Sequence, residues 1–248
     1  MTILFPKNKK AALKEISPPA GYVNHVAAGL KLPGKAVLCP ISSLTRYVES
    51  HAKYKKYNCE ADIYVLEGQN LCYVTNFGSG APGMAMALEV LIALGIKEFV
   101  FIGLAGSLQE EVDPADIVLA SEALCDDGTS PCYTNKETAK PAKTLFSKLA
   151  KQLEADGKNF HTGRNWTTDA IFRETKAEVK HYQKEAVLTV EMETAAFYAI
   201  CAKRKVQGAA AFAVSDVLAR YKWEPHFGEK PIFRALEDIF TAAQKVLK

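Results

Sequence analysis

Strand-like apolar runs alternate with helical patterns along most of the chain. The runs predict strands at 35–40, 98–103, 116–120, 186–190 and 208–216, and a pair of strands within 61–78 joined by a turn at 67–70. Amphipathic spacing predicts helices at 43–54, 82–95 and 231–248. Ser42 or Ser43 is the expected N-cap of the first helix, and Gly95 is expected to end the second.

The order of these elements predicts a single α/β domain. Strands joined by crossover helices form a mixed, mainly parallel sheet with helices on both faces. We interpret the polar, proline-containing residues 1–34 as a peripheral N-terminal lead of one domain spanning 1–248. Ligands of such sheets bind beyond the carboxyl ends of the strands. The segments of interest therefore follow predicted strands, at 76–83, 103–108, 190–194 and 214–219.

Composition and charge exclude several classes of partner. Of the 248 residues, 48% are hydrophobic and 24% charged, and the formal net charge is +3. So small a charge argues against nucleic acid or an anionic membrane as a partner. No apolar run reaches the roughly 18–20 residues of a membrane span, and no signal-peptide core begins the chain. The six cysteines are scattered without zinc-ligand spacing, so we expect reduced thiols, no bound metal and a cytoplasmic protein.

Two glycine-rich segments, 76–83 (NFGSGAPG) and 103–108 (GLAGSL), follow predicted strands and are expected to be turns. Glycine lets the backbone approach a ligand and leaves N–H groups free to form an anion-binding nest. A tight turn that requires positive φ is the alternative. Neither segment fits the dinucleotide pattern G-x-G-x-x-G, and the P-loop pattern occurs nowhere, so nucleotide-cofactor and NTPase functions are rejected.

Glu191-Met192-Glu193 stands where a predicted strand passes into a helix rich in small residues. If both glutamates end the strand, their side chains point to one side of the sheet. A carboxylate there can accept hydrogen bonds from two neighbouring hydroxyls and so hold a vicinal diol, at about 1.5–3 kcal/mol per bond. The alternative is a glutamate that only complements the helix dipole, worth about 0.3–1 kcal/mol.

Ser215 and Asp216 are expected to follow a strand of small apolar residues. Partial burial would raise the pKa of Asp216 toward neutrality and make it a candidate general acid, while a helix or turn cap is an equal alternative. Residues 165–174 (NWTTDAIFRE) are predicted to form a loop whose aromatic side chains make one wall of a base-sized slot.

Together these motifs resemble the nucleoside phosphorylase-I superfamily, which includes purine nucleoside and uridine phosphorylases and related nucleosidases. The resemblance covers roughly residues 35–248. It is carried by VEMETAAFYA, AVSDVL, GLAGSL, NFGSGAPGMAMALEVLIALG and TTDAIFRE. It implies a partly barrel-like, phosphorylase/hydrolase-like fold that cleaves an N-glycosidic bond. It also implies a homo-oligomer, commonly a dimer or a hexamer.

The resemblance implies roles for individual residues. Glu193 would bind the ribose hydroxyls, Met192 would lie under the sugar, and Asp216 would be the catalytic residue that assists protonation of a purine. The residues expected around the base are Glu191, Ile171, Phe172, Arg173 and Ser215. Those expected near phosphate or another nucleophile are Gly103, Ala105, Gly106, Ser107 and Arg46.

The chain departs from the family pattern at the phosphate site. The segment after the first strand reads CPISSLTRYVE, in which Arg46 is only close to the family's arginine position. Phe101 and Leu104 occupy the positions of a second arginine and of a Ser or Thr. An arginine fork binds phosphate bidentately and phenylalanine cannot. The difference favours either water as the nucleophile or phosphate held by other groups, among them a basic residue of a neighbouring subunit.

The leading expectation is phosphorolysis of a purine-leaning nucleoside to free base and ribose 1-phosphate, with inorganic phosphate as co-substrate and no cofactor. A hydrolytic nucleosidase is one alternative, although the N-terminal GAMxxE segment of that branch is absent. Uridine phosphorylase is another, because Arg173 is present, but the matching glutamine of that branch is not. The rival from a different class is a non-catalytic nucleoside-binding or storage protein.

Overall fold

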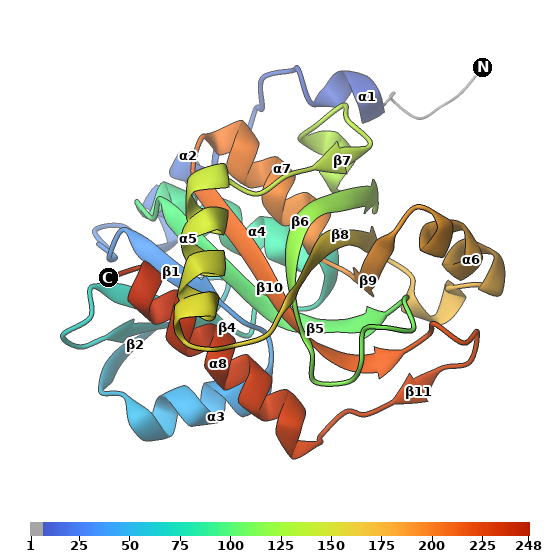
Figure 1. The fold of residues 1–248 in the computed structure, drawn as a ribbon. Coiled ribbons are helices and arrows are strands. Elements are labelled where there is room, and N and C mark those ends of the chain that lie inside the picture. Colours follow the sequence, from blue (N-terminus) through green and yellow to red (C-terminus); the bar gives the residue numbers. More distant parts are fainter. Residues whose placement is uncertain (1–6) are drawn as a thin grey trace.

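The computed structural model describes residues 7–248, and an eleven-stranded sheet forms its centre (Figure 1). The strands are β1 (Lys35–Leu38), β2 (Tyr54–Asn58), β3 (Asp62–Leu66), β4 (Leu71–Thr75), β5 (Glu98–Ser107), β6 (Ile117–Asp126), β7 (Thr138–Ala139), β8 (His161–Thr168), β9 (Val187–Glu191), β10 (Gln207–Val217) and β11 (Glu224–Pro225).

The pairing of these strands closes part of the sheet. β1 lies between β4 and β5 in parallel, and β5 also pairs in parallel with β10. From β10 the sheet continues through β6 and β8 to β9. β9 then pairs with the last residues of β5, Gly106 and Ser107. β5, β10, β6, β8 and β9 therefore form a closed ring, which confirms the predicted mixed, partly barrel-like sheet.

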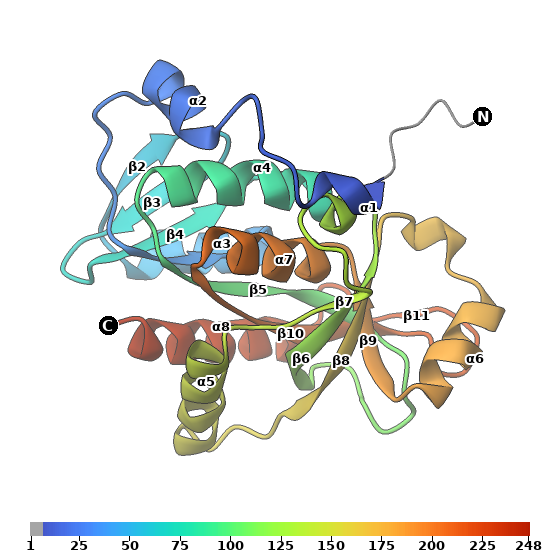
Figure 2. The same ribbon diagram turned by 90° about the horizontal axis from the view of Figure 1, so that it is seen from above.

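Helices cover both faces of the sheet, as predicted (Figure 2). They are α1 (Lys7–Lys10), α2 (Pro19–Val26), α3 (Ser42–His51), α4 (Gly80–Ala93), α5 (Lys143–Ala155), α6 (Lys176–Lys184), α7 (Thr194–Arg204) and α8 (Lys230–Val246), with 3₁₀ helices η1 (Ser130–Cys132) and η2 (Ile171–Arg173). α4 and α7 pack on one face, and α3, α5 and α8 on the other. Within residues 7–248, no helix is long and apolar enough to cross a membrane.

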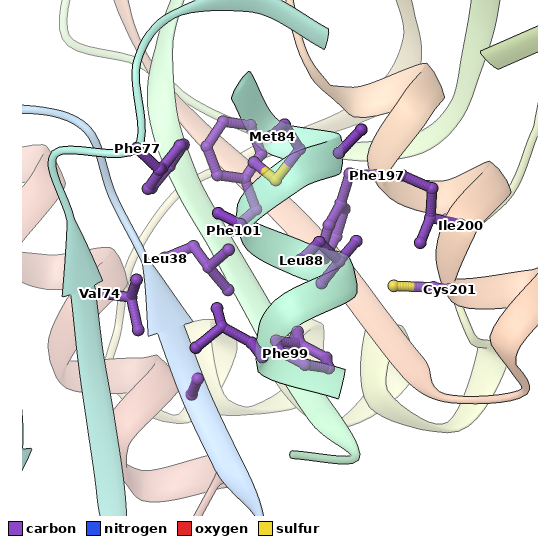
Figure 3. Close-up of a cluster of buried hydrophobic side chains, with 14 of the residues drawn as sticks. Leu38, Val74, Phe77, Met84, Leu88, Phe99, Phe101, Phe197, Ile200 and Cys201 are labelled. Atoms are coloured by element: carbon purple, nitrogen blue, oxygen red, sulfur yellow. The ribbon is translucent and has the colours of Figure 1, made fainter. Parts of the chain in front are cut away.

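Alternate residues of the central strands point into two separate cores. Phe99 and Phe101 of β5 point toward α4 and α7, where Phe197 packs beside them (Figure 3). Val100 and Ile102 of the same strand belong to the core under α3, α5 and α8. Successive side chains of a strand point to opposite faces, so a strand covered on both sides is apolar throughout.

The described part of the N-terminal lead, residues 7–34, lies outside α4 and α7 (Figure 2). Val23 of α2 is buried in the core formed by α4 and α7. The Lys203 ammonium of α7 donates a hydrogen bond of 2.6 Å to the Ala11 carbonyl. Residues 7–34 of the lead therefore pack on helices and add no strand to the sheet.

The bounds of the first long helix were predicted wrongly. α3 ends at His51 instead of residue 54, because residues 54–58 form β2 and pair with β3. Its N-cap is Ile41, and no side chain caps it, so the assignment of Ser42 or Ser43 was also wrong. Gly95 follows the end of α4 with φ 105°, as predicted for a glycine that stops a helix.

Strands near the site are longer than predicted. β5 runs through Ser107 and β10 through Val217, because the two strands pair along their whole length. The segment 103–107 is therefore strand and not a glycine-rich turn, which corrects the prediction. Residues 165–168 likewise belong to β8 rather than to a loop, because they pair with both β6 and β9.

Candidate active site

A cavity of about 570 Å³ lies at the carboxyl ends of β5, β9 and β10. Figure 1 shows these strand ends on the same side of the molecule as α6 and β11. The carboxyl, hydroxyl and thioether side chains that line it include those of Glu174, Glu191, Met192, Glu193, Ser215 and Asp216. Its size suits a small organic ligand, since such pockets measure about 300–1,000 Å³.

Glu191, the last residue of β9, is buried and fully hydrogen-bonded. Its Oε1 accepts from the Asn165 amide at 2.8 Å and from the Thr167 hydroxyl at 2.6 Å. Its Oε2 accepts from the backbone N–H groups of Glu193 at 2.7 Å and Thr194 at 2.9 Å. Burial raises the pKa of Glu191, and these donors oppose the shift by stabilising the carboxylate. Both oxygens of Glu191 thus bind protein groups, and two of these bonds hold the start of α7.

Glu193 is the N-cap residue of α7, so the prediction that both glutamates end the strand was wrong. It lines the cavity, and its Oε1 accepts a hydrogen bond of 2.5 Å from the backbone N–H of Gly80 at the start of α4. Burial, followed by the charge of Glu191, raises the pKa of Glu193 to about 8. Met192 lines the cavity beside it. The environment of Glu193 is therefore that of a ligand-facing carboxyl, unlike that of Glu191.

A β-bulge brings Asp216 to the cavity. Val214 pairs with Ala105 and Asp216 pairs with Gly106, so Ser215 is the extra residue between the two pairs. A bulge bends the strand and redirects the side chains next to it. Ser215 and Asp216 therefore lie within β10, as the predicted strand 208–216 implied, and the expectation that they follow the strand was wrong.

Two donors hold the Asp216 carboxylate. The Ser215 hydroxyl donates to Oδ1 at 2.7 Å, and the Trp223 indole N–H donates to Oδ2 at 2.9 Å. A Cβ at Gly106 would lie 3.0 Å from Asp216 Oδ2 and 2.6 Å from Leu218 Cδ1. Glycine at position 106 therefore makes room for the Asp216 side chain.

A second carboxyl, Glu174, lines the cavity immediately before α6. Burial raises its pKa to about 7, with smaller contributions from the charges of Asp216 and Glu178. The following residue, Thr175, forms a capping box with Glu178, which fixes where the chain enters the helix. Although acidic groups meet here, no group of three or more His, Cys, Asp or Glu side chains within residues 7–248 could hold a metal ion.

The structure brings most of the predicted site residues to this cavity. Those that line it are Ile171, Phe172, Glu191, Met192, Glu193, Ser215, Asp216, Gly103, Ala105 and Gly106. Arg173 on η2 and Arg46 on α3 are exposed and lie outside it. Ser107 is buried outside the lining, and its hydroxyl donates to the Gln109 carbonyl at 2.8 Å.

The side predicted to hold phosphate is apolar. Ile41, Phe101 and Leu104 line it. The backbone of 103–107 pairs with β10 residue by residue, so it is not a free anion-binding nest. Among the described residues, the cations that line the cavity are Lys176 and Lys222.

The motifs in the sequence did not predict a role for Glu174, Trp223 or the pair Asn165 and Thr167. Glu174 had a signal, because the capping-box pattern T-x-x-E at 175–178 places the preceding residue at a helix entrance. Asn165 and Thr167 had none, since they reach Glu191 only through the pairing of β8 with β9. Trp223 meets Asp216 because β11 folds back on β10, which no local pattern predicts.

The site is thus a cavity lined by carboxyl groups at the strand ends of a partly closed α/β sheet. The chain matches the model of the Phosphorylase superfamily over residues 40–243, and it belongs to that family. It is 30% identical over 201 residues to the guanosine phosphorylase of Halorubrum lacusprofundi, covering 79% of each chain. It is 27% identical over 176 residues to the DeoD-type purine nucleoside phosphorylase of Clostridium novyi, covering 70% of this chain and 72% of the relative.

A solved structure shares the fold. The purine nucleoside phosphorylase of Toxoplasma gondii, crystallised in complex with immucillin-H, superposes with a TM-score of 0.77 over 88% of this chain and 91% of that chain. At 18% sequence identity, this similarity shows the fold alone. The predicted fold and the predicted superfamily, which is one of enzymes, are therefore confirmed.

Proposed function

We propose that the protein cleaves the N-glycosidic bond of a purine nucleoside by phosphorolysis, giving free base and ribose 1-phosphate. One observation carries the proposal: Glu193 with Met192, and Asp216 with Ser215, line a single cavity at the strand ends. The two relatives described above are named for guanosine and for purine nucleosides. Inorganic phosphate is the co-substrate, and no metal or organic cofactor is proposed.

The two carboxyls suit opposite halves of the transition state. As the bond breaks, positive charge develops on the sugar and negative charge on the base. Glu193 accepts hydrogen bonds from the ribose hydroxyls, and Met192 packs under the sugar. Asp216 assists protonation of the departing base. Groups that stabilise charge developing in the transition state accelerate the reaction, and a positioned acid contributes about 10²–10⁴-fold.

The base end of the cavity favours a purine over uracil. Ile171, Phe172 and Trp223 give it apolar and aromatic walls against which a two-ring base can stack. Arg173, the residue expected to read uracil, is exposed outside the cavity. We therefore propose a purine nucleoside as the substrate.

Hydrolysis is the second candidate, and one observation favours it. Phe101 and Leu104 line the side where phosphate would bind, and the cavity-lining cations of the described chain, Lys176 and Lys222, come from other elements. An apolar wall gives a phosphate dianion no counter-charge, whereas water needs none. Phosphorolysis therefore requires a cation from outside this cavity wall.

The test is base release from inosine, guanosine, adenosine and uridine, with and without phosphate. Release from purine nucleosides only when phosphate is present supports the proposal, and equal release without it supports a nucleosidase. Binding without release from any nucleoside identifies a non-catalytic protein. With an active enzyme, Asp216→Asn should lower kcat far more than it raises KM, and Glu193→Ala should impair both.

We also propose a homo-oligomer, either a dimer or a hexamer. Large apolar side chains near the cavity are exposed, among them Phe172 at 93%, Trp223 at 59% and Phe227 at 54%. A second copy covering them would bury apolar surface and could bring a cation to the nucleophile side. Light scattering should find a multimer for the wild type and a smaller species for Phe172→Glu. A monomeric wild type contradicts the proposal.

A further inference from the structure

Glu174 is a cavity-lining carboxyl to which the proposed function assigns no role. It stands between η2 and α6 and lines the same cavity as Asp216. Asp216 receives hydrogen bonds from Ser215 and Trp223, whereas no donor within residues 7–248 reaches the side chain of Glu174. A partly buried carboxyl without donors is costly to ionise, while donors stabilise the charged form.

The fold holds Glu174 and Asp216 at one cavity. Thr175 caps α6 directly after Glu174. Tyr221, in the loop that follows β10, packs on the same helix: the Lys176 ammonium lies 4.8 Å from its ring centre, and its hydroxyl donates to Gln183 Oε1 at 2.9 Å. These contacts therefore hold α6, which follows Glu174, against the loop that follows Asp216.

Burial and two negative charges favour the neutral form of Glu174. Burial raises the pKa of Glu174 to about 7, and the negative charges of Asp216 on β10 and Glu178 on α6 add to the shift. Glu178 is occupied by the helix cap, since its Oε2 accepts from the Thr175 N–H at 2.8 Å and from its hydroxyl at 2.6 Å. Two lysines also line the cavity, Lys176 on α6 and Lys222 in the loop after β10.

We propose that Glu174, which lines the same cavity as Asp216, carries a proton in the free protein and passes it to the departing base. A carboxyl that its surroundings keep neutral near pH 7 is suited to act as the general acid. This inference rests on the proposed function and adds a second catalytic residue to it.

The step balances without a further reactant. The bond between the sugar C1′ and the base nitrogen breaks, and its electron pair stays with the base. A ring nitrogen of the base takes the proton of the Glu174 carboxyl, while the nucleophile oxygen bonds to C1′. The proton that phosphate or water loses goes to solvent, and solvent reprotonates Glu174 after the base leaves.

The first experiment needs no turnover. Infrared difference spectra of the free wild-type protein, compared with Glu174→Gln across pH 5.5–9, should show a protonated carboxyl at pH 6, in addition to that of Glu193, that ionises on raising the pH and is missing in the variant. Asp216→Asn should shift that ionisation to lower pH, because it removes a neighbouring negative charge. Glu185→Gln, an exposed change beyond the other end of α6, is the matched control and should leave the spectrum unchanged. A wild type without the Glu174 signal overturns the inference, whether or not the protein is active.

The second experiment compares leaving groups. With inosine and phosphate at saturation, Glu174→Gln should lower kcat about 10²-fold. The decrease of kcat at high pH, which the wild type shows as Glu174 ionises, should be weaker in this variant. With 7-methylguanosine, whose base is already cationic and needs no proton, the variant should stay within about threefold of the wild type. If wild type and Glu174→Gln have the same kcat on inosine, the role of Glu174 is overturned, while the proposed function stands. A wild type that releases no base, yet shows the Glu174 signal, overturns the proposed function and leaves the proton assignment standing.

Discussion

At the scale of single residues, Glu193 is a carboxyl that the fold prefers to keep neutral. Its pKa is raised to about 8, mainly by burial, against an ordinary value of 4.5. The folded state therefore binds more protons than the unfolded state between these values, so Glu193 lowers stability as pH rises from about 5 to 8. Glu193→Gln removes this penalty and keeps an oxygen for the Gly80 N–H.

We expect Glu193→Gln to be more stable than the wild type at pH 9 by about 2–4 kcal/mol, with the difference vanishing near pH 5. The same change should lower kcat/KM about 10–100-fold, because an amide oxygen binds hydroxyls less strongly than a carboxylate. Urea denaturation at both pH values and base-release kinetics measure the two effects. If wild type and Glu193→Gln are equally stable at pH 9, ionisation of Glu193 does not lower the free energy of unfolding.

Glu191, two residues earlier, should respond in the opposite way. All of its acceptor positions face donors, from Asn165, Thr167 and two backbone N–H groups. A glutamine there must turn its NH₂ toward one donor pair, so Glu191→Gln should cost about 2–3 kcal/mol of stability. The urea midpoint of this variant, beside that of Glu193→Gln, provides the measurement. A stabilised Glu191→Gln would contradict the assigned hydrogen bonds.

At the scale of elements, the paired ends of β5 and β10 set the shape of the base end. Gly106 faces Asp216 across this pair, and a Cβ there would lie 2.6 Å from Leu218 Cδ1 and 3.0 Å from Asp216 Oδ2. Gly106→Ala should therefore displace both side chains. We expect a loss of about 1–3 kcal/mol in stability and at least a tenfold loss of kcat.

A glycine outside the site provides the control for this prediction. Gly34→Ala introduces a Cβ with nothing within 4 Å and without positive φ, so it should leave kcat unchanged. Thermal denaturation and base-release kinetics of both variants make the comparison. If Gly106→Ala keeps the wild-type kcat, the position of Asp216 does not depend on the close approach of the two strands.

The sequence predicted elements better than it predicted their ends. Apolar runs on β5 and β10 mark buried strands, but the motifs GLAGS and SD look like loops because glycine and aspartate are rare in strands. Their strand conformation depends on pairing between segments about a hundred residues apart, including a bulge at Ser215. Local patterns therefore located Asp216 near a strand end and could not reveal that a bulge turns it into the cavity.

At the scale of the whole molecule, the closed ring of strands explains why the site could be predicted only in part. β9 meets the end of β5, and this pairing joins the EME segment to the Gly106 segment. The resemblance to the family predicted that these two motifs belong to one site. The resemblance offered no role for Glu174, whose place in the cavity depends on how α6 and the loop after β10 pack on each other.

One ionic cluster ties the N-terminal lead to the helical layer. The Arg204 guanidinium, at the end of α7, donates to Glu89 of α4 at 2.8–3.1 Å and to Glu15 of the lead at 2.7 Å. Glu89 is only 8% exposed, so its charge depends on Arg204 for compensation. Glu15 is exposed and has water as an alternative partner.

Arg204→Ala should therefore lower the free energy of unfolding by about 3–5 kcal/mol, because it leaves the Glu89 charge buried and unpaired. Glu15→Ala should cost less than about 1 kcal/mol, as an exposed ion pair does. Urea denaturation at neutral pH separates the two. Equal losses would mean that attachment of the lead, rather than the buried pair between α4 and α7, controls stability. Neither residue lines the cavity, so both variants should keep the wild-type kcat wherever they are folded.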